Sequence, residues 1–248
     1  MKKFFYICNW KAYLSFKQAN ELVAHNKAAL TTLGKTYNIV ICPSFDAIAT
    51  IGHELKGTGI GLGAQDCSSH KPGAFTGQVL ASSLKEIGCS YCIIGHAEIR
   101  KEFQQALGTI AQKAQLLLEQ GITPIICIGE SAQEFDIGIG VQAIEQQLGP
   151  VLQTLKHLAA QKTIAIAYEP TWVIGSGAVP PAAYLASQLE TIKRLCSQHI
   201  PDAKTLLLYG GGVDEFTIKP LLGTTLLDGV LVGKASTDFQ KLQKIVLS

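Results

Sequence analysis

The chain has 248 residues, of which 47% are hydrophobic and 16% are charged, and its formal net charge at pH 7 is +2. This length allows one large α/β domain or two small ones, and the hydrophobic content is sufficient for a sizeable core. The small net charge argues against nucleic acid or a membrane surface as a partner. No apolar run approaches the length of a membrane span.

The N-terminal sequence MKKFFYICNWK places two lysines before an apolar run, as a secretory signal peptide does. The apolar stretch Phe4–Cys8 is shorter than the hydrophobic region of such a peptide, and the polar residues Asn9 and Lys11 follow it directly. We therefore interpret this stretch as a buried first strand.

Short apolar runs recur along the chain. They are rich in Ile, Val, Leu or Cys and do not alternate with polar residues, which is typical of strands buried on both faces of a parallel sheet. The eight runs span residues 4–9, 38–43, 59–65, 91–96, 123–129, 163–169, 205–211 and 228–233.

Helix-like stretches separate many of these runs. Some begin with a capping residue or with proline, and one is followed by glycine. They cover residues 15–30, 101–120, 131–161, 180–199, 214–222 and 236–246, and internal glycines and a proline divide the third into two helices. Eight strands alternating with helices predict one α/β domain over residues 1–248, a closed (β/α)8 barrel with eight parallel strands. An open doubly wound sheet is the alternative.

The chain contains seven cysteines, an odd number, and several lie inside the apolar runs. This pattern indicates buried free thiols in a reducing compartment, so we expect a cytoplasmic protein. Cys89 and Cys92 form a C-x-x-C pair, but the pair leads into a strand, whereas a thioredoxin-like site opens a helix. We therefore expect no redox function.

Both candidate folds carry their active sites at the C-terminal ends of the strands. Asn9 and Lys11 end the first run, His96 ends the fourth, and Glu169 ends the sixth. Each has a structural explanation of its own: a solvated loop lysine, a hydrogen-bonded histidine, a solvent-facing carboxylate. The functional interpretation depends on their coincidence at one rim. His96 also opens a helix-like segment, whose N-terminus would keep the imidazole neutral.

The seventh and eighth runs end in glycine-rich turns, Gly210–Gly212 and Gly233. Backbone N–H groups in such turns can bind phosphate, a common role for the last two loops of a barrel. The candidates are Gly212, Gly233 and the backbone of Lys234. The G-x-G-x-x-A pattern at residues 59–64 lies within a strand, so we infer no dinucleotide site from it.

Metal and nucleophile chemistry have little support in the sequence. The six histidines are scattered without an H-x-x-x-H pair, and there is no G-x-S-x-G elbow. The remaining set is one carboxylate, one imidazole, one ammonium and a phosphate cradle. This set suits proton transfer next to a carbonyl.

Along its whole length the chain resembles the triosephosphate isomerase family, whose fold is the TIM barrel. The segments that carry the resemblance occur in the family's order and spacing: Asn9-Trp10-Lys11, Gly73-Ala74-Phe75-Thr76-Gly77, Ile94-Gly95-His96, Cys127-Ile128-Gly129-Glu130, Ala167-Tyr168-Glu169-Pro170 with Trp172 and Ile174-Gly175, Tyr209-Gly210-Gly211, and Val232-Gly233.

The resemblance implies an isomerase that interconverts dihydroxyacetone phosphate and D-glyceraldehyde 3-phosphate through an enediolate, without a metal or cofactor. By resemblance, Glu169 is the base that removes the proton next to the carbonyl, and neutral His96 polarises the carbonyl oxygen. Lys11 and Asn9 bind the substrate and stabilise the negative charge of the enediolate.

The resemblance also implies a moving lid and a dimer. Residues 170–172 are the stiff hinge of the lid, and residues 173–177 are its tip, where Gly175 and Ser176 reach the phosphate. The family is usually homodimeric, and its third loop, here residues 67–78, enters the neighbouring subunit with Thr76 reaching across.

Some positions depart from the family's pattern. Around the catalytic histidine, Ala97 replaces a serine and Ile99 replaces an arginine of the dimer interface. The other departures are Gln78 for glutamate, Pro180 in the second lid hinge, Gly212 for serine and Lys234 for glycine. They spare the four catalytic candidates, so we expect an active isomerase. The alternatives are a catalytically weakened paralogue that binds a phosphate ligand or a protein partner, and a barrel isomerase for another phosphosugar.

Overall fold

The computed structural model describes residues 4–175 and 178–248 of the chain. Eight parallel strands pair in sequence order, and the eighth pairs with the first to close a barrel. The strands are β1 (Phe5–Asn9), β2 (Asn38–Cys42), β3 (Gly61–Ala64), β4 (Tyr91–Ile94), β5 (Thr123–Ile128), β6 (Thr163–Tyr168), β7 (Lys204–Tyr209) and β8 (Gly229–Val232). The predicted (β/α)8 barrel and its eight strands are thus confirmed, and the open sheet is wrong.

The closing pair of the barrel depends on a glycine. Phe5 pairs with Gly229, and Cys8 pairs with Val232. A Cβ atom at Gly229 would lie 2.4 Å from the carbonyl oxygen of Phe5, so only glycine allows β8 to approach β1 this closely.

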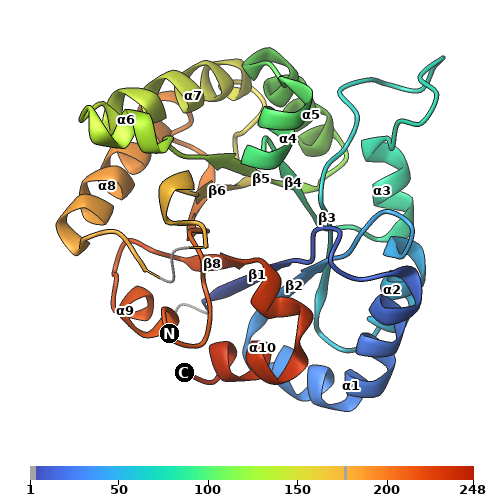
Figure 1. Ribbon diagram of the computed structural model, residues 1–248. Helices are drawn as coiled ribbons and strands as arrows, with labels where there is room; N and C mark the ends of the chain where they lie inside the picture. Colours follow the sequence, from blue (N-terminus) through green and yellow to red (C-terminus); the bar gives the residue numbers. More distant parts are fainter. Residues whose placement is uncertain (1–3, 176–177) are drawn as a thin grey trace.

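Helices surround the strands and form the outer ring of the molecule (Figure 1). The α-helices are α1 (Phe16–Thr36), α2 (Ile48–Glu54), α3 (Ala81–Ile87), α4 (Ala97–Phe103), α5 (Leu107–Glu119), α6 (Ala132–Asp136), α7 (Gly140–Leu155), α8 (Ala182–His199), α9 (Ile218–Leu222) and α10 (Phe239–Val246). Two short 3₁₀ helices, η1 (Thr171–Val173) and η2 (Lys234–Thr237), follow β6 and β8.

The structure corrects several helix predictions. The single helix expected over residues 101–120 is wrong, because α4 ends at Phe103 with Gln104 in a left-handed conformation (φ 47°) before α5 begins. The helix expected from Asp214 begins only at Ile218, and α2 and α3 were not predicted. The division of residues 131–161 into two helices is confirmed.

Two apolar layers bury the strands on both faces. One fills the barrel, and the other packs the strands against the surrounding helices. The inner layer consists of Ile7, Val40, Cys42, Ile93, Ile125, Cys127, Ala165, Ala167, Leu206, Leu208 and Leu231. Burial on both faces explains why the runs lack polar alternation.

All seven cysteines are buried and free, as the sequence predicted. Burial raises the pKa of Cys89 to about 12, so its thiol stays protonated at neutral pH. Cys92 lies fully buried in β4. The C-x-x-C pair therefore has neither the exposure nor the thiolate character of a redox site.

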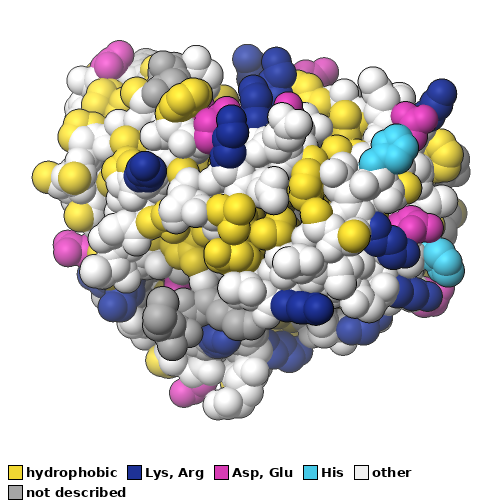
Figure 2. Space-filling view, turned by 90° about the horizontal axis from the view of Figure 1, so that it is seen from below, with side chains coloured by type: hydrophobic (Ala, Val, Ile, Leu, Met, Phe, Trp, Pro, Cys, Tyr) yellow, Lys and Arg dark blue, Asp and Glu magenta, His cyan; other side chains and the backbone are white. Residues whose placement is uncertain are grey.

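Within the described residues, no helix is long and apolar enough to cross a membrane. On the face drawn in Figure 2, the Lys and Arg side chains lie scattered, with Asp and Glu side chains among them. This face presents no continuous basic stripe among its described residues.

Candidate active site

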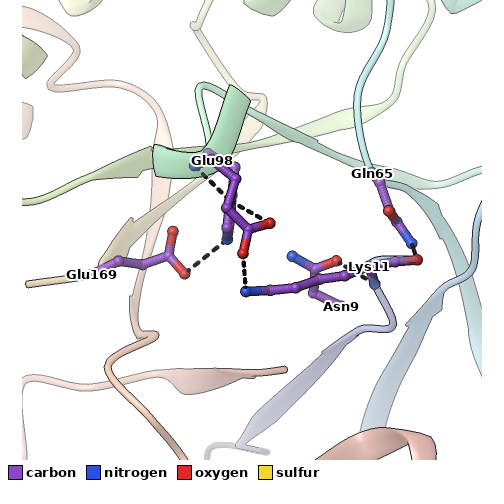
Figure 3. A network of polar contacts seen from close by, with 6 residues as sticks. Asn9, Lys11, Gln65, Glu98 and Glu169 are labelled. Atoms are coloured by element: carbon purple, nitrogen blue, oxygen red, sulfur yellow. Dashed lines mark hydrogen bonds and ion pairs between the residues drawn. The ribbon is translucent and has the colours of Figure 1, made fainter. Parts of the chain in front are cut away.

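The barrel brings the predicted polar strand ends together at one rim. Asn9 is the last residue of β1, Glu169 directly follows β6, and His96 lies two residues beyond β4. The His96 Nε2 atom is 3.5 Å from Oε1 of Glu169, although the two residues are far apart in the sequence. Figure 3 shows the side chains of Glu169 and Lys11 approaching the same space from different strand ends.

Lys11 is held in a conformation that non-glycine residues seldom adopt. Its φ is 48°, and its backbone N–H donates to Oδ1 of buried Asn9 over 3.1 Å. Gln65 fixes the same turn, because its Nε2 donates to the carbonyls of Lys11 (2.8 Å) and Cys42 (3.0 Å). The strain is therefore offset by three hydrogen bonds that aim Lys11 at the rim.

The Lys11 ammonium contacts Glu98 in the first turn of α4, with 2.5 Å between Nζ and Oε1 (Figure 3). Neither Glu98 nor Gln65 was among the residues predicted from the sequence to have a role at the site. A carboxylate in the first helical turn directly after His96 was the available signal for Glu98. No sequence signal pointed to Gln65, whose partners come from two different strand ends.

His96 caps the N-terminus of α4 as the sequence predicted. Its Nδ1 accepts the backbone N–H of Glu98 over 3.3 Å, which assigns the ring proton to Nε2, the nitrogen that faces Glu169. Burial lowers the pKa of His96, but the charge and hydrogen bond of Glu169 raise it, and the net direction is upward. Burial thus favours neutral imidazole, while the Glu169 carboxylate opposes it.

Glu169 is 3% exposed. The alternative interpretation of this residue, a carboxylate that simply faces solvent, is therefore wrong. Burial raises the pKa of its carboxyl group, whereas His96, Cys127 and Lys11 lower it, and the net direction is downward. The carboxylate is therefore ionised at neutral pH. Among the described residues its Oε2 has no hydrogen-bond partner, which leaves a lone pair for accepting a proton.

Two glycines leave the space that Glu169 occupies. A Cβ atom at Gly129 would lie 2.0 Å from the Glu169 carbonyl oxygen. One at Gly210 would lie 2.6 Å from Cγ and 2.7 Å from Oε1 of the same residue. Gly210 therefore determines where the carboxylate sits, a role that its glycine-rich turn did not reveal.

The segment after Glu169 is anchored by a buried carboxylate. Oε1 of Glu130 accepts hydrogen bonds from Trp172 Nε1 (2.8 Å), the Tyr168 hydroxyl (2.9 Å) and the Tyr184 hydroxyl (3.0 Å). Phe135 stacks on the indole of Trp172 with ring centroids 3.9 Å apart. The predicted stiff hinge is thus held by hydrogen bonds and ring stacking, a network that was not predicted from the sequence.

A pocket of about 690 Å³ opens beside this rim. Its walls include Lys11, Glu169 and Gly175 and the three phosphate candidates Gly212, Gly233 and Lys234. Gly212 and Gly175 have positive φ angles of 69° and 81°, which glycine adopts without strain. Ser176 lies outside the described residues.

Two of the departures from the family pattern have visible consequences. Ala97 is the first residue of α4 and has no hydroxyl to offer Glu169. A Cβ atom at Gly212 would lie 3.4 Å from the carbonyl oxygen of Val173, so a side chain there would touch the lid segment. Gly212 has no side chain and therefore does not make this contact.

Within the described residues, no group of three or more His, Cys, Asp or Glu side chains is arranged to hold a metal ion. The arrangement instead offers a buried base and an ammonium that line one pocket, with Nε2 of His96 3.5 Å from the base. Such a set can remove a proton from carbon and stabilise the resulting oxyanion.

Comparisons with known proteins identify similar chains. The family model described as triosephosphate isomerase matches residues 4–248. The chain is 37% identical over 243 residues to triosephosphate isomerase of Aquifex aeolicus, covering 97% of each chain. It is 34% identical to that of Thermus thermophilus, covering 94% of this chain and 93% of the relative. It is 33% identical to triosephosphate isomerase of Endomicrobium trichonymphae, and the match covers 96% of this chain and 95% of the relative.

Proposed function

The chain belongs to the triosephosphate isomerase family, and from this membership we propose how its own side chains perform the reaction. The protein is an isomerase that interconverts dihydroxyacetone phosphate and D-glyceraldehyde 3-phosphate, a step of glycolysis and gluconeogenesis. The observation that carries the residue assignment is the ionised, buried carboxylate of Glu169 beside Nε2 of His96.

Glu169 removes the proton from the carbon next to the substrate carbonyl and returns it to the neighbouring carbon. Support comes from its lowered pKa, which keeps the carboxylate in the basic form, and from its Oε2, which no described residue engages in a hydrogen bond. The electron pair released from the C–H bond forms the enediolate, whose negative charge develops on oxygen.

His96 and Lys11 stabilise that oxygen. The ring proton of His96 lies on Nε2, because Nδ1 is occupied as an acceptor, so Nε2–H donates to the substrate oxygen. The Lys11 ammonium supplies positive charge next to it, and Asn9, whose Oδ1 fixes the Lys11 backbone, adds its side-chain amide. Fixed donors and charges of this kind need little reorganisation during the reaction.

The phosphate of the substrate binds at the glycine turns after β7 and β8. Backbone N–H groups of Gly212, Gly233 and Lys234 form the cradle, and Gly175 with Ser176 closes over it from the lid. Closure excludes water and uses phosphate binding to orient the reacting carbon.

A deuterium-exchange experiment tests this mechanism. In D2O, the purified protein should convert glyceraldehyde 3-phosphate to dihydroxyacetone phosphate with solvent deuterium on carbon, because the base exchanges its proton while the enediolate exists. Mass spectrometry of the product measures the label. Conversion without any label would contradict a single exchangeable carboxylate as the base.

The alternative of a catalytically weakened paralogue is not favoured. A protein that had lost its reaction would be expected to lose the groups that contact the reacting atoms, yet Asn9, Lys11, His96 and Glu169 are all present at one rim. An isomerase for another phosphosugar is disfavoured by the family membership.

The protein also functions as a homodimer in this proposal. The loop between β3 and α3 extends away from the barrel (Figure 1). Its base is closed by the Ser68 N–H donating to the Val79 carbonyl over 2.7 Å, and Phe75 in its tip is 41% exposed while stacked on His70. A protruding loop with an exposed ring pair fits insertion into a second copy, with Thr76 reaching across.

Replacing Phe75 with Asp and Thr76 with Arg should convert the dimer into a monomer with lower kcat, because two charges would enter an apolar interface. Sedimentation velocity measures the mass. The matched control is Leu247→Asp, a charge placed at an exposed apolar residue of the C-terminus, which should leave the mass unchanged. A wild-type monomer, or a dimer in the double variant, would contradict the proposed interface.

We further propose that residues 1–248 form a single domain, that the reaction uses no metal or cofactor, and that the protein is cytoplasmic. The closed barrel formed by all eight strands supports the first proposal. The seven buried free thiols support a reducing location.

A further inference from the structure

Lys234 places a second ammonium at the phosphate end of the pocket. It directly follows Gly233 and opens η2, so its backbone lies at the proposed cradle. Its exposed side chain lines the same pocket as Lys11 and Gly212, and its Nζ lies 6.0 Å from the centre of the Tyr13 ring. The Tyr13 ring, which also lines the pocket, attracts the ammonium toward the pocket wall.

The charge of Lys234 is not neutralised by an ion pair in the way that the charge of Lys11 is. Lys11 contacts Glu98 at 2.5 Å, whereas no carboxylate of the described residues lies within 4.0 Å of Lys234 Nζ. A Cβ atom at Gly233 would lie 3.8 Å from Lys11 Cε, so the Lys11 stem passes beside the turn from which Lys234 projects. Both lysines therefore border one end of the pocket.

Besides Glu169, three carboxylates line the same pocket, those of Asp214, Glu215 and Asp238, and two of them accept backbone hydrogen bonds. Asp214 Oδ1 accepts the backbone N–H groups of Phe216 and Thr217, each over 2.9 Å. Asp238 Oδ1 accepts those of Gln240 and Lys241 at the start of α10. Backbone donors thus offset the negative charge of both side chains, which leaves the Lys234 ammonium available to an incoming anion.

We propose that the Lys234 side chain is a specificity-determining residue that binds the phosphate dianion of the substrate alongside the backbone cradle. This inference rests on the proposed function, because it assigns the phosphate to the glycine turns. The flexible four-carbon stem lets the ammonium reach an anion held at the backbone of the same residue. The Lys234 side-chain contact is made equally in the ground state and the transition state, so it lowers KM and leaves kcat nearly unchanged.

Lys234→Gln should raise the KM for glyceraldehyde 3-phosphate about three- to tenfold, the range of one partly exposed charge-assisted contact. The inhibition constant of inorganic phosphate should rise by a similar factor, while kcat stays within about twofold of wild type. Lys234→Arg should retain the wild-type KM within about twofold, because it keeps the charge.

Lys219→Gln is the matched control, because it removes the same charge from an exposed residue of α9 that does not line this pocket. Unchanged KM and phosphate inhibition in Lys234→Gln, or equal increases in Lys219→Gln, would overturn the proposal. Calorimetric titration with inorganic phosphate gives a separate readout. If the wild type bound phosphate through Lys234 but did not isomerise the triose, the proposed function would fail while the phosphate contact of Lys234 would still be measured, so the two failures are distinguishable.

Discussion

Replacing Glu169 with glutamine is expected to lower kcat by about 10²–10⁴-fold, the contribution typical of a positioned general base. The amide has nearly the same shape as the carboxylate but cannot accept the proton from carbon. Glutamine also needs no counter-charge from His96 in a site that is 3% exposed, so we expect the variant to fold normally. Steady-state kinetics in both directions measure the change.

The pattern of the kinetic constants separates a base from a binding residue. If Glu169 acts only as base, KM should change little. The rate at which deuterium is incorporated into the product should fall by the same factor as kcat. Glu190→Gln, an exposed position on α8, is the control for loss of one carboxylate and should behave as wild type. A Glu169→Gln protein that keeps more than about a tenth of the wild-type kcat would rule out the assignment.

The fold was predictable because the strands are buried on both faces. Runs such as those that became β5 and β6 contain almost no polar residue, and this continuity distinguishes them from amphipathic helices. The missed helices α2 and α3 are short, and neither has a side chain that caps its N-terminus. The break between α4 and α5 occurs at Gln104 in a left-handed conformation, for which glycine would be the usual signal.

The catalytic candidates were predictable for a related reason, since each lies at the end of a buried strand or within two residues of it. Their partners were not, because Glu98, Gln65 and Glu130 act across loops that meet only after the barrel closes. The direction in which the pKa of His96 shifts also depends on a contact between distant parts of the chain, that of His96 with Glu169. The sequence showed a helix start that favours neutral imidazole, but the opposing carboxylate becomes visible only in the fold.

Gly210→Ala is expected to lower kcat about 10²-fold through a displacement of Glu169, without contacting the substrate. Its Cβ would overlap Cγ and Oε1 of Glu169 at 2.6 and 2.7 Å. The backbone on both sides is fixed, because the Glu169 N–H donates to Ile128 (2.7 Å) and the Gly210 N–H donates to Tyr168 (2.9 Å). The flexible carboxylate must therefore move away from His96. Since Gly210 does not have a positive φ, the backbone accepts alanine, and we expect only a small loss of thermal stability.

A double variant tests whether Gly210 acts through Glu169. When the base is already absent in Glu169→Gln, adding Gly210→Ala should reduce kcat by less than about threefold, because the two changes remove the same function. Gly108→Ala is the control for an added methyl group, since a Cβ there meets no atom within 4 Å, and it should leave kcat unchanged. A full, multiplicative loss in the double variant would show that Gly210 serves another step, such as phosphate binding, because then the carboxylate would not be the group that alanine displaces.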